Sequence, residues 1–390
     1  MPQQIDHHLI KITKFYFFSF VALMAITSFL DPLAYAFGNM MIGRGRFADF
    51  YDIVVVAKNY PNIGSYCVTP WHYSFYQIFD QFKINANSLF IGYNFIIIML
   101  AGMVVAELKK IFQINTNSIY LLIFSYPVLF GLWRGNTEVL SFLLFFLATI
   151  YLYQQDATKS FKWYLLSVFT KPNYLINGVI YLSAINKKIL LQGILFVAIC
   201  FLLIYSFDNP KHAVDVSSAC LAKYIEAYIS GDGGTLFNNS LYGLVKSTLY
   251  SLYNYHDANI ISNTIYSHFT KYWWLIFGGI SFYAVRKYSY EETLFIVLAS
   301  FIFLYPVSAD YRLASLCIPV LFMTAINYEK WKFVIYTTLV IMLPKHFIWF
   351  RLTELDVNVT LNSFANPILL LIAITTVFVK GNNGSSARVS

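Results

Sequence analysis

The sequence predicts an all-α integral membrane protein, and three observations lead to that fold class. Apolar and aromatic residues (AVILMFWYC) make up 58% of the 390 residues, and only 12% are charged. A soluble domain carries roughly 25% charged residues. Apolar runs follow one another along almost the whole chain, and pairs of basic residues separate many of them. We therefore expect a bundle of about 10–12 transmembrane helices.

The expected spans are these apolar runs, several of which are short. The first, Phe15–Phe37, is too long for a signal-peptide core and lacks a clear small-residue cleavage site, so we interpret it as a retained spanning helix. A span needs roughly 20 residues, so shorter runs must tilt or lie buried in protein, which favours a bundle with a cavity. The other runs are Ser88–Ala106, Ile119–Trp133, Val139–Tyr153, Ile189–Phe207, Trp273–Val285, Thr293–Ser308, Leu313–Asn327, Phe333–Phe350 and Pro367–Val379.

The basic pairs indicate the orientation, because positive charge concentrates on the cytoplasmic side. They place both termini in the cytoplasm and make a multi-pass plasma (inner) membrane location the expected one. Residues 1–380 are then a single transmembrane domain, with a first outer loop at 38–87 and a disordered cytoplasmic tail at 381–390. The pairs are Lys11/Lys14, Lys109/Lys110, Lys159/Lys162, Lys187/Lys188, Arg286/Lys287 and Lys330/Lys332.

A second outer loop, 208–272, is the only one large enough for structure of its own. Ala219–Ile229 and Leu241–Tyr253 are expected there as short amphipathic helices with aromatic faces. Helices of this kind lie along a membrane surface.

The segment Phe161–Ile185 is broken at Lys171-Pro172 and fits the charge alternation only if it enters and leaves on the same side. Each half has about ten residues and reaches only near the bilayer midplane. We expect a re-entrant helical pair with Lys171-Pro172 at its tip. The alternative is one span kinked at Pro172, which would place Lys187 and Lys188 outside.

The net charge of +8 does not indicate nucleic acid, because the basic residues form pairs beside hydrophobic segments. The four cysteines lack the spacing of a metal or redox centre, so no cofactor is expected. Cys67 and Cys220 both fall in expected outer loops and could pair. A divalent metal is left open without support, since Asp49 and Asp52 would share a helical face but have no clear third ligand.

Ionisable residues of both signs gather at the outer ends of the expected helices. An anionic substrate and a catalytic base would require such a mixture, whereas the expected cytoplasmic ends carry basic pairs with few acids. Lys171 is the most informative, because a lysine at the tip of a re-entrant pair is costly unless it meets an anion. The candidate site residues are Asp49, Asp52, Arg134, Asn136, Lys171, Tyr311, Arg312 and His346.

Several of these residues also have plain structural interpretations. Arg134 could contact a phosphate, pair with Glu138 or extend towards the lipid surface. Asp310 and Arg312 are close enough in sequence for a local ion pair. His346 fits an interfacial hydrogen bonder as well as a proton-transfer group.

Short motifs in a fixed order resemble the polytopic GT-C glycosyltransferases, and most of all glycosyltransferase family 87, a mannosyltransferase-like group. The first outer loop has Asp49-Phe50 and, later, the turn Val68-Thr69-Pro70-Trp71-His72-Tyr73, where the family has two consecutive prolines. Gly135-Asn136 and Lys171-Pro172 match further motifs, and the Tyr311 segment resembles the start of a late helix. The resemblance extends from about Phe15 to about Lys332 and rests on the order of the motifs.

The resemblance implies an enzyme that transfers a hexose or pentose from a polyprenyl-phosphate donor to a cell-envelope glycan or glycolipid on the extracytoplasmic face. Asp49 would be the base that deprotonates the acceptor hydroxyl. Lys171 and Arg134 would contact the donor phosphate. The expected partners are therefore the lipid-linked donor, the acceptor and membrane lipids, without nucleic acid.

Two alternatives stay open. A polymerase that joins lipid-linked polysaccharide repeat units would rely on arginines more than on one carboxylate. A transporter or flippase of lipid-linked sugars would show paired halves or charges along the whole membrane depth, whereas the charges here gather at the outer ends.

Overall fold

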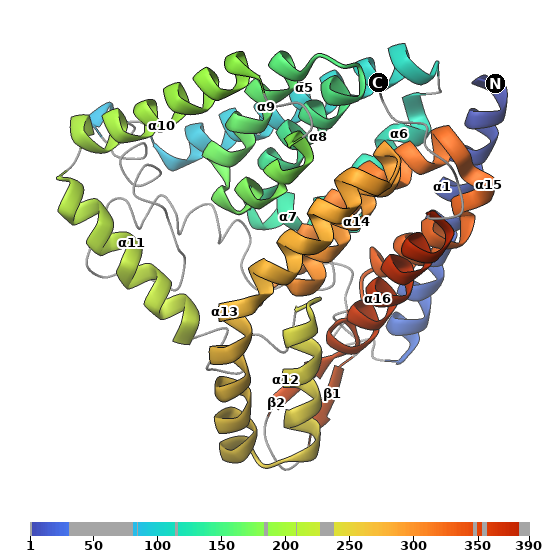
Figure 1. Cartoon of the computed structure of the whole chain (residues 1–390). Coiled ribbons are helices and arrows are strands. Elements are labelled where there is room, and N and C mark those ends of the chain that lie inside the picture. The colour runs from blue at the N-terminus through green and yellow to red at the C-terminus, as the bar shows by residue number, and fades with distance from the viewer. Residues whose placement is uncertain are drawn as a thin grey trace. The chain divides into compact units, whose positions relative to one another are not determined.

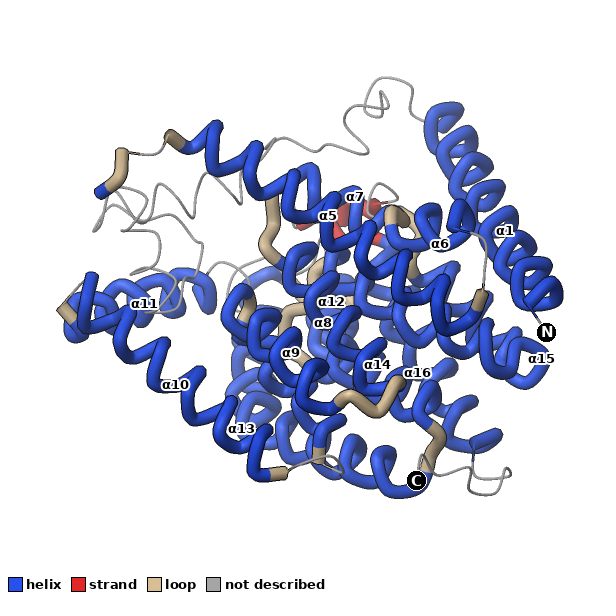
Figure 2. Tube along the Cα trace, turned by 90° about the horizontal axis from the view of Figure 1, so that it is seen from above, coloured by secondary structure: helices blue, strands red, loops and turns tan. Residues whose placement is uncertain are grey.

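The computed structural model describes residues 2–30, 81–83, 85–113, 116–182, 186–207, 209–226, 238–345, 349–352 and 357–381. This part of the chain is all-α in class, with one pair of short strands as the exception (Figure 2). Four of its helices are long and apolar enough to cross a membrane, which agrees with the expected membrane protein at this level. The number of spans stays a prediction. By length and composition alone, the four candidate spans are Ser88–Phe112, Lys187–Ser206, Asp310–Ile341, which is interrupted at Asn327, and Leu361–Gly381.

The chain divides into two compact units. The first comprises Met1–Gly43, Val105–Phe130 and Tyr228–Ser390, and the second comprises Arg44–Val104 and Gly131–Ala227. Of the four divisions between them, two fall within α5 (Ala86–Phe112) and α7 (Tyr126–Arg134), and the other two, after Gly43 and after Ala227, lie outside the described residues.

Helix α14, Tyr290–Leu304, forms the core of the first unit. It is buried along nearly its whole length and packs against α13, α15 and α16, with α16 running beside it in Figure 1. A helix that is apolar on all sides belongs in the interior of a bundle. The other described helices that lie wholly in this unit are α1 (Pro2–Leu30), α6 (Thr116–Ile123), α12 (Leu241–Leu252), α13 (Tyr255–Lys287), the 3₁₀ helix η4 (Asp310–Leu316), α15 (Cys317–Ile341) and α16 (Leu361–Gly381).

Helix α15 reverses direction at Asn327, whose φ of −153° and ψ of 67° are not helical. The hydroxyl of Tyr16 donates to the Met342 carbonyl at 3.2 Å and accepts from the Tyr126 backbone N–H at 2.9 Å. The Tyr126 hydroxyl in turn donates to Asp310 at 3.3 Å. A continuous helix would hold Asp310 and Met342 about 48 Å apart. The two segments of α15 are therefore antiparallel, as the two expected runs Leu313–Asn327 and Phe333–Phe350 require.

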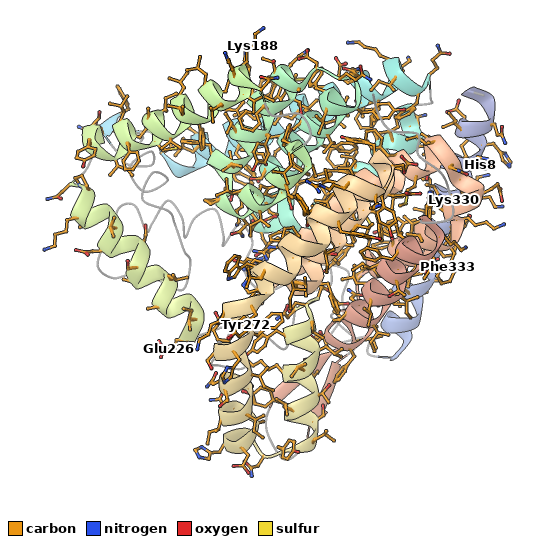
Figure 3. All side chains as sticks on the ribbon, in the orientation of Figure 1. His8, Lys188, Glu226, Tyr272, Lys330 and Phe333 are labelled. Carbon is orange, nitrogen blue, oxygen red and sulfur yellow. The ribbon has the colours of Figure 1, made fainter. Side chains whose placement is uncertain are left out.

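The second segment of α15 runs from this reversal to Ile341. Lys330 follows the reversal and is labelled in Figure 3. Its ammonium lies 2.7 Å from the carboxylate of Glu292 in the first turn of α14. The expected helical run Phe333–Phe350 is too long, since the helix ends before Pro344, a residue that disfavours helical geometry before it. The last residues of the expected run, Trp349 and Phe350, belong to strand β1 (Trp349–Leu352). This strand pairs antiparallel with β2 (Val357–Thr360).

Much of the expected outer loop 208–272 is helical. Helix α12 agrees with the expected Leu241–Tyr253, whereas α13 begins at Tyr255, well before the expected Trp273. Tyr242 in α12 hydrogen-bonds Ser262 in α13 at 3.0 Å, so α12 packs against α13 as a helical hairpin (Figure 1). In the other unit, α11 covers Pro210–Tyr224 rather than the expected Ala219–Ile229, because Asn209 caps it and Pro210 occupies its first position.

In the second unit, α8 (Glu138–Tyr153) is the buried helix and packs mainly against α9 (Ala157–Thr170), which lies beside it in Figures 1 and 2. Helix α10 (Lys187–Phe207) packs on α9 and exposes most of its apolar side chains, as a lipid-facing helix would. The expected run Ile119–Trp133 is broken into the two helices α6 and α7, because Pro127 can begin a helix but not continue one.

The segment from α9 to the 3₁₀ helix η1 (Pro172–Tyr181) folds back on itself. The Ser160 and Tyr181 hydroxyls lie 2.7 Å apart, and Tyr164 donates to the Leu175 carbonyl at 2.7 Å. A single kinked span would separate residues 160 and 181 by about 30 Å. The chain therefore folds back at Lys171-Pro172, as the expected pair requires, and its second half is a 3₁₀ helix, while its entry and exit on one side of a membrane stay a prediction.

Candidate functional site

Lys171 lies at the tip of the fold-back in the second unit. Its backbone is extended, with φ −149° and ψ 103°, because Pro172 disfavours helical geometry in the residue before it. The preceding side chain anchors the tip on α8, since the hydroxyls of Thr170 and Ser141 lie 2.6 Å apart. The sequence at this point therefore ends α9 and fixes the position from which Lys171 extends.

Gly135-Asn136 connects α7 to α8. Gly135 has φ 66°, a left-handed conformation that glycine adopts without strain. Its N–H donates to the Leu132 carbonyl at 3.0 Å, and the Asn136 N–H donates to Gly131 at 2.8 Å. This pair of bonds is a Schellman motif, which satisfies carbonyls at a helix end. The motif thus has a structural reason to contain glycine, independent of any ligand.

Asn136 lies two residues before α8, and its side chain reaches Lys171. Its side-chain oxygen accepts from the Glu138 backbone N–H at 2.9 Å and from the Lys171 ammonium at 3.4 Å. Tyr93 fixes the same residue by donating to its backbone carbonyl at 2.6 Å. Asn136 is 6% exposed, so it acts as a buried support for the lysine.

Glu138 is the acid of this site, and it was missed as a site residue. It is the first residue of α8, where the helix dipole favours a negative charge, and its side chain is 3% exposed. Its carboxylate lies 3.8 Å from the Lys171 ammonium, whose side chain is 24% exposed. The signal that could have found it is an acid at a helix start two residues after a Gly-Asn turn.

Arg134 is the last residue of α7 and is half-buried, one residue before Gly135. The second unit therefore brings Asn136, Lys171 and Glu138 into contact and places Arg134 at the start of the same turn. A partly exposed lysine held in this way suits a phosphate or another compact anion.

Tyr311 and Arg312 belong to the first unit, in η4. The Tyr311 ring stacks on Phe130 with 6.5 Å between centroids. Arg312 is buried, donates to the Val307 carbonyl at 2.7 Å and lies 4.1 Å from the ring centre of Tyr305. These contacts hold the arginine against its own segment.

Asp310 lies in the same helix and is completely buried. It accepts hydrogen bonds from the amide of Asn239 at 3.0 Å, from the amide of Asn362 at 2.8 Å to each oxygen, and from Tyr126. A further amide, that of Asn366, donates to Asn239 at 2.6 Å. These donors satisfy the buried oxygens of Asp310, so the cluster anchors η4 to α16, to α7 and to the segment just before α12.

Lys345 follows the end of α15 and caps that helix. Its ammonium donates to the carbonyls of Val340, Ile341 and Leu343 at 2.7, 3.1 and 2.9 Å. Burial lowers the pKa of Lys345 to about 7, and the negative charge of Asp310 acts in the opposite direction. The neighbouring candidate His346 lies outside the described residues.

Asp49 and Asp52 also lie outside the described residues, as does Cys67 of the open Cys67–Cys220 pairing. Among the residues that the structure describes, no group of three or more His, Cys, Asp and Glu side chains is placed to hold a metal.

Comparison with known proteins identifies no relative of this chain. No family model, curated protein or solved structure matches it.

Proposed function

We propose that this chain is a membrane-embedded glycosyltransferase of the GT-C type that uses a polyprenyl-phosphate sugar as donor. It transfers a hexose or pentose to a cell-envelope glycan or glycolipid on the extracytoplasmic face of the plasma (inner) membrane. The proposal rests on the order of the family-87-like motifs and on one observation in the structure, the placement of Lys171.

Lys171 supports this function because it is a partly exposed cation held at a fixed point by buried groups. Asn136 and Glu138 contact its ammonium, and Pro172 fixes its backbone. A leaving phosphate is stabilised by cations that are already in place where the charge develops. Arg134, at the start of the adjoining turn, would contribute a second charge.

The base is assigned to Asp49 from the family resemblance. The carboxylates described at the other candidate segments suit that task less well, because Asp310 is completely buried with several donors and Glu138 faces Lys171. A general base must reach the hydroxyl that it deprotonates. In this proposal Asp49 activates the acceptor, and Asp52, Tyr311, Arg312 and His346 contribute to substrate binding.

The test is sugar transfer from radiolabelled polyprenyl-phosphate sugars by membranes that contain matched amounts of each protein. Lys171→Ala should reduce transfer by roughly 100-fold, because one fixed charge at the leaving group is lost. Lys162→Ala is the control, since Lys162 is an exposed lysine of α9, the helix that ends just before Lys171. Equal activity of the two variants would contradict the role of Lys171. Movement of the lipid-linked sugar across vesicles without transfer would favour a transporter instead.

A further inference from the structure

The carboxylate of Glu138 is buried and has an oxygen without a hydrogen bond to any described residue. Its side chain is 3% exposed, and the oxygen nearest to Lys171, Oε2, has no hydrogen-bond partner within the described part of the chain. The 3.8 Å to the ammonium is an ion-pair distance, longer than a hydrogen bond. Buried polar atoms without a partner are uncommon in folded proteins and weaken the folded state.

We propose that Glu138 binds a hydroxyl of the donor sugar while Lys171 binds the donor phosphate. This inference rests on the proposed function and names a specificity residue within it. Carboxylates accept hydrogen bonds from hydroxyls, and such charge-assisted bonds are stronger than neutral ones. The ligand class is a polyprenyl phosphate with a sugar that has a free hydroxyl on the carbon next to the one bonded to phosphate.

The short distance between the Lys171 and Glu138 side chains favours a ligand of this class. Lys171 Nζ and Glu138 Oε2 are 3.8 Å apart, so the two groups can address neighbouring atoms of one ligand. A phosphate on the anomeric carbon and a hydroxyl on the next carbon are separated by only a few bonds. A bare polyprenyl phosphate offers Glu138 no donor and brings a second negative charge close to it.

The experiment compares the binding of bare polyprenyl phosphate with that of its hexosyl, pentosyl and matching 2-deoxy sugar forms. The wild type should bind one glycosylated form about tenfold or more tightly than the bare lipid, and the 2-deoxy form should lose that preference. Glu138→Gln and Glu138→Ala should lose it too, while they bind the bare lipid at least as well as the wild type. Retained binding of the bare lipid also shows that the variants are folded.

Glu329→Gln is the matched control, because Glu329 is an exposed carboxylate in a surface ion pair with Lys332. It should keep the preference of the wild type. The inference is overturned if both Glu138 variants also keep the preference. In that case the proposed function still stands. A wild type that binds none of these lipids would overturn the proposed function together with the inference.

Discussion

Gly135 and Lys171 show how backbone chemistry prepares the candidate site. Gly135 takes a left-handed conformation that ends α7, and the next residue supports Lys171 with its side chain. Pro172 extends the backbone of Lys171 and ends α9. Each of these two motifs therefore has a structural role whether or not a ligand binds.

Gly135→Ala should lower the stability of the protein by about 1–2 kcal/mol, because a side chain at this φ contacts the backbone unfavourably. The measurement is thermal unfolding in detergent. Gly92→Ala is the control, since a methyl group there would meet nothing within 4 Å and alanine favours a helix. An unchanged melting temperature for Gly135→Ala would contradict the proposed role of the turn.

At the residue scale, the sequence allowed Asn136 and Lys171 to be singled out, because a turn motif and a Lys-Pro break are local signals. Asp310 was given only a local ion pair as its structural interpretation. Its partners Asn239 and Asn362 are far away in sequence, and no local pattern indicates which amides meet a carboxylate. Lys345 presents the same difficulty, since its role depends on where α15 ends.

At the element scale, helix α13 is longer than a membrane span and changes character along its length. It has 33 residues and a length of about 50 Å, so about 20 Å of it would stand outside a hydrocarbon core of about 30 Å. Its exposed side chains change from mostly polar to apolar at Tyr272, which Figure 3 labels. Before Tyr272 the exposed residues are His256, Asp257, Thr264, Ser267, His268 and Lys271, with Ile260 as the apolar exception. From Tyr272 onwards the exposed apolar residues are Tyr272, Trp274, Leu275, Ile276, Phe282 and Tyr283, and the exposed Arg286 and Lys287 follow at the end of the helix.

We expect the membrane boundary at Tyr272, with the beginning of α13 on the extracytoplasmic side. In a cysteine-free background, Thr264→Cys should react in intact cells with a membrane-impermeant maleimide, and Ile276→Cys should not. Both positions are exposed in the structure, so burial in protein does not explain a difference. Equal labelling at both positions would show that the boundary lies elsewhere.

Element boundaries were predictable where proline or glycine marks them and unpredictable where packing sets them. The break at Lys171-Pro172 was visible in the sequence. The beginning of α13 was not, because polar residues over Tyr255–Lys271 resemble a loop, and this part is helical while packed against α12. Tyr250 of α12 adds a bond to Asn259 at 3.3 Å.

At the scale of the whole molecule, composition predicted the fold class because lipid requires long apolar segments with few charges. The division into two units was not predicted, since two of its four boundaries fall inside the helices α5 and α7. Contacts between residues far apart in the chain define each unit, and one sequence does not reveal such contacts.

The most direct test of the proposed enzyme is sugar transfer by the wild type, Asp49→Asn and Asp52→Asn, supplied with radiolabelled polyprenyl-phosphate sugars at matched protein levels. Asp49→Asn should abolish transfer but still bind the donor, because the base acts on the acceptor and the phosphate contacts are unchanged. Asp52→Asn should retain transfer with weaker substrate binding. Full activity of Asp49→Asn, or the absence of transfer by the wild type with every donor, would contradict the proposal.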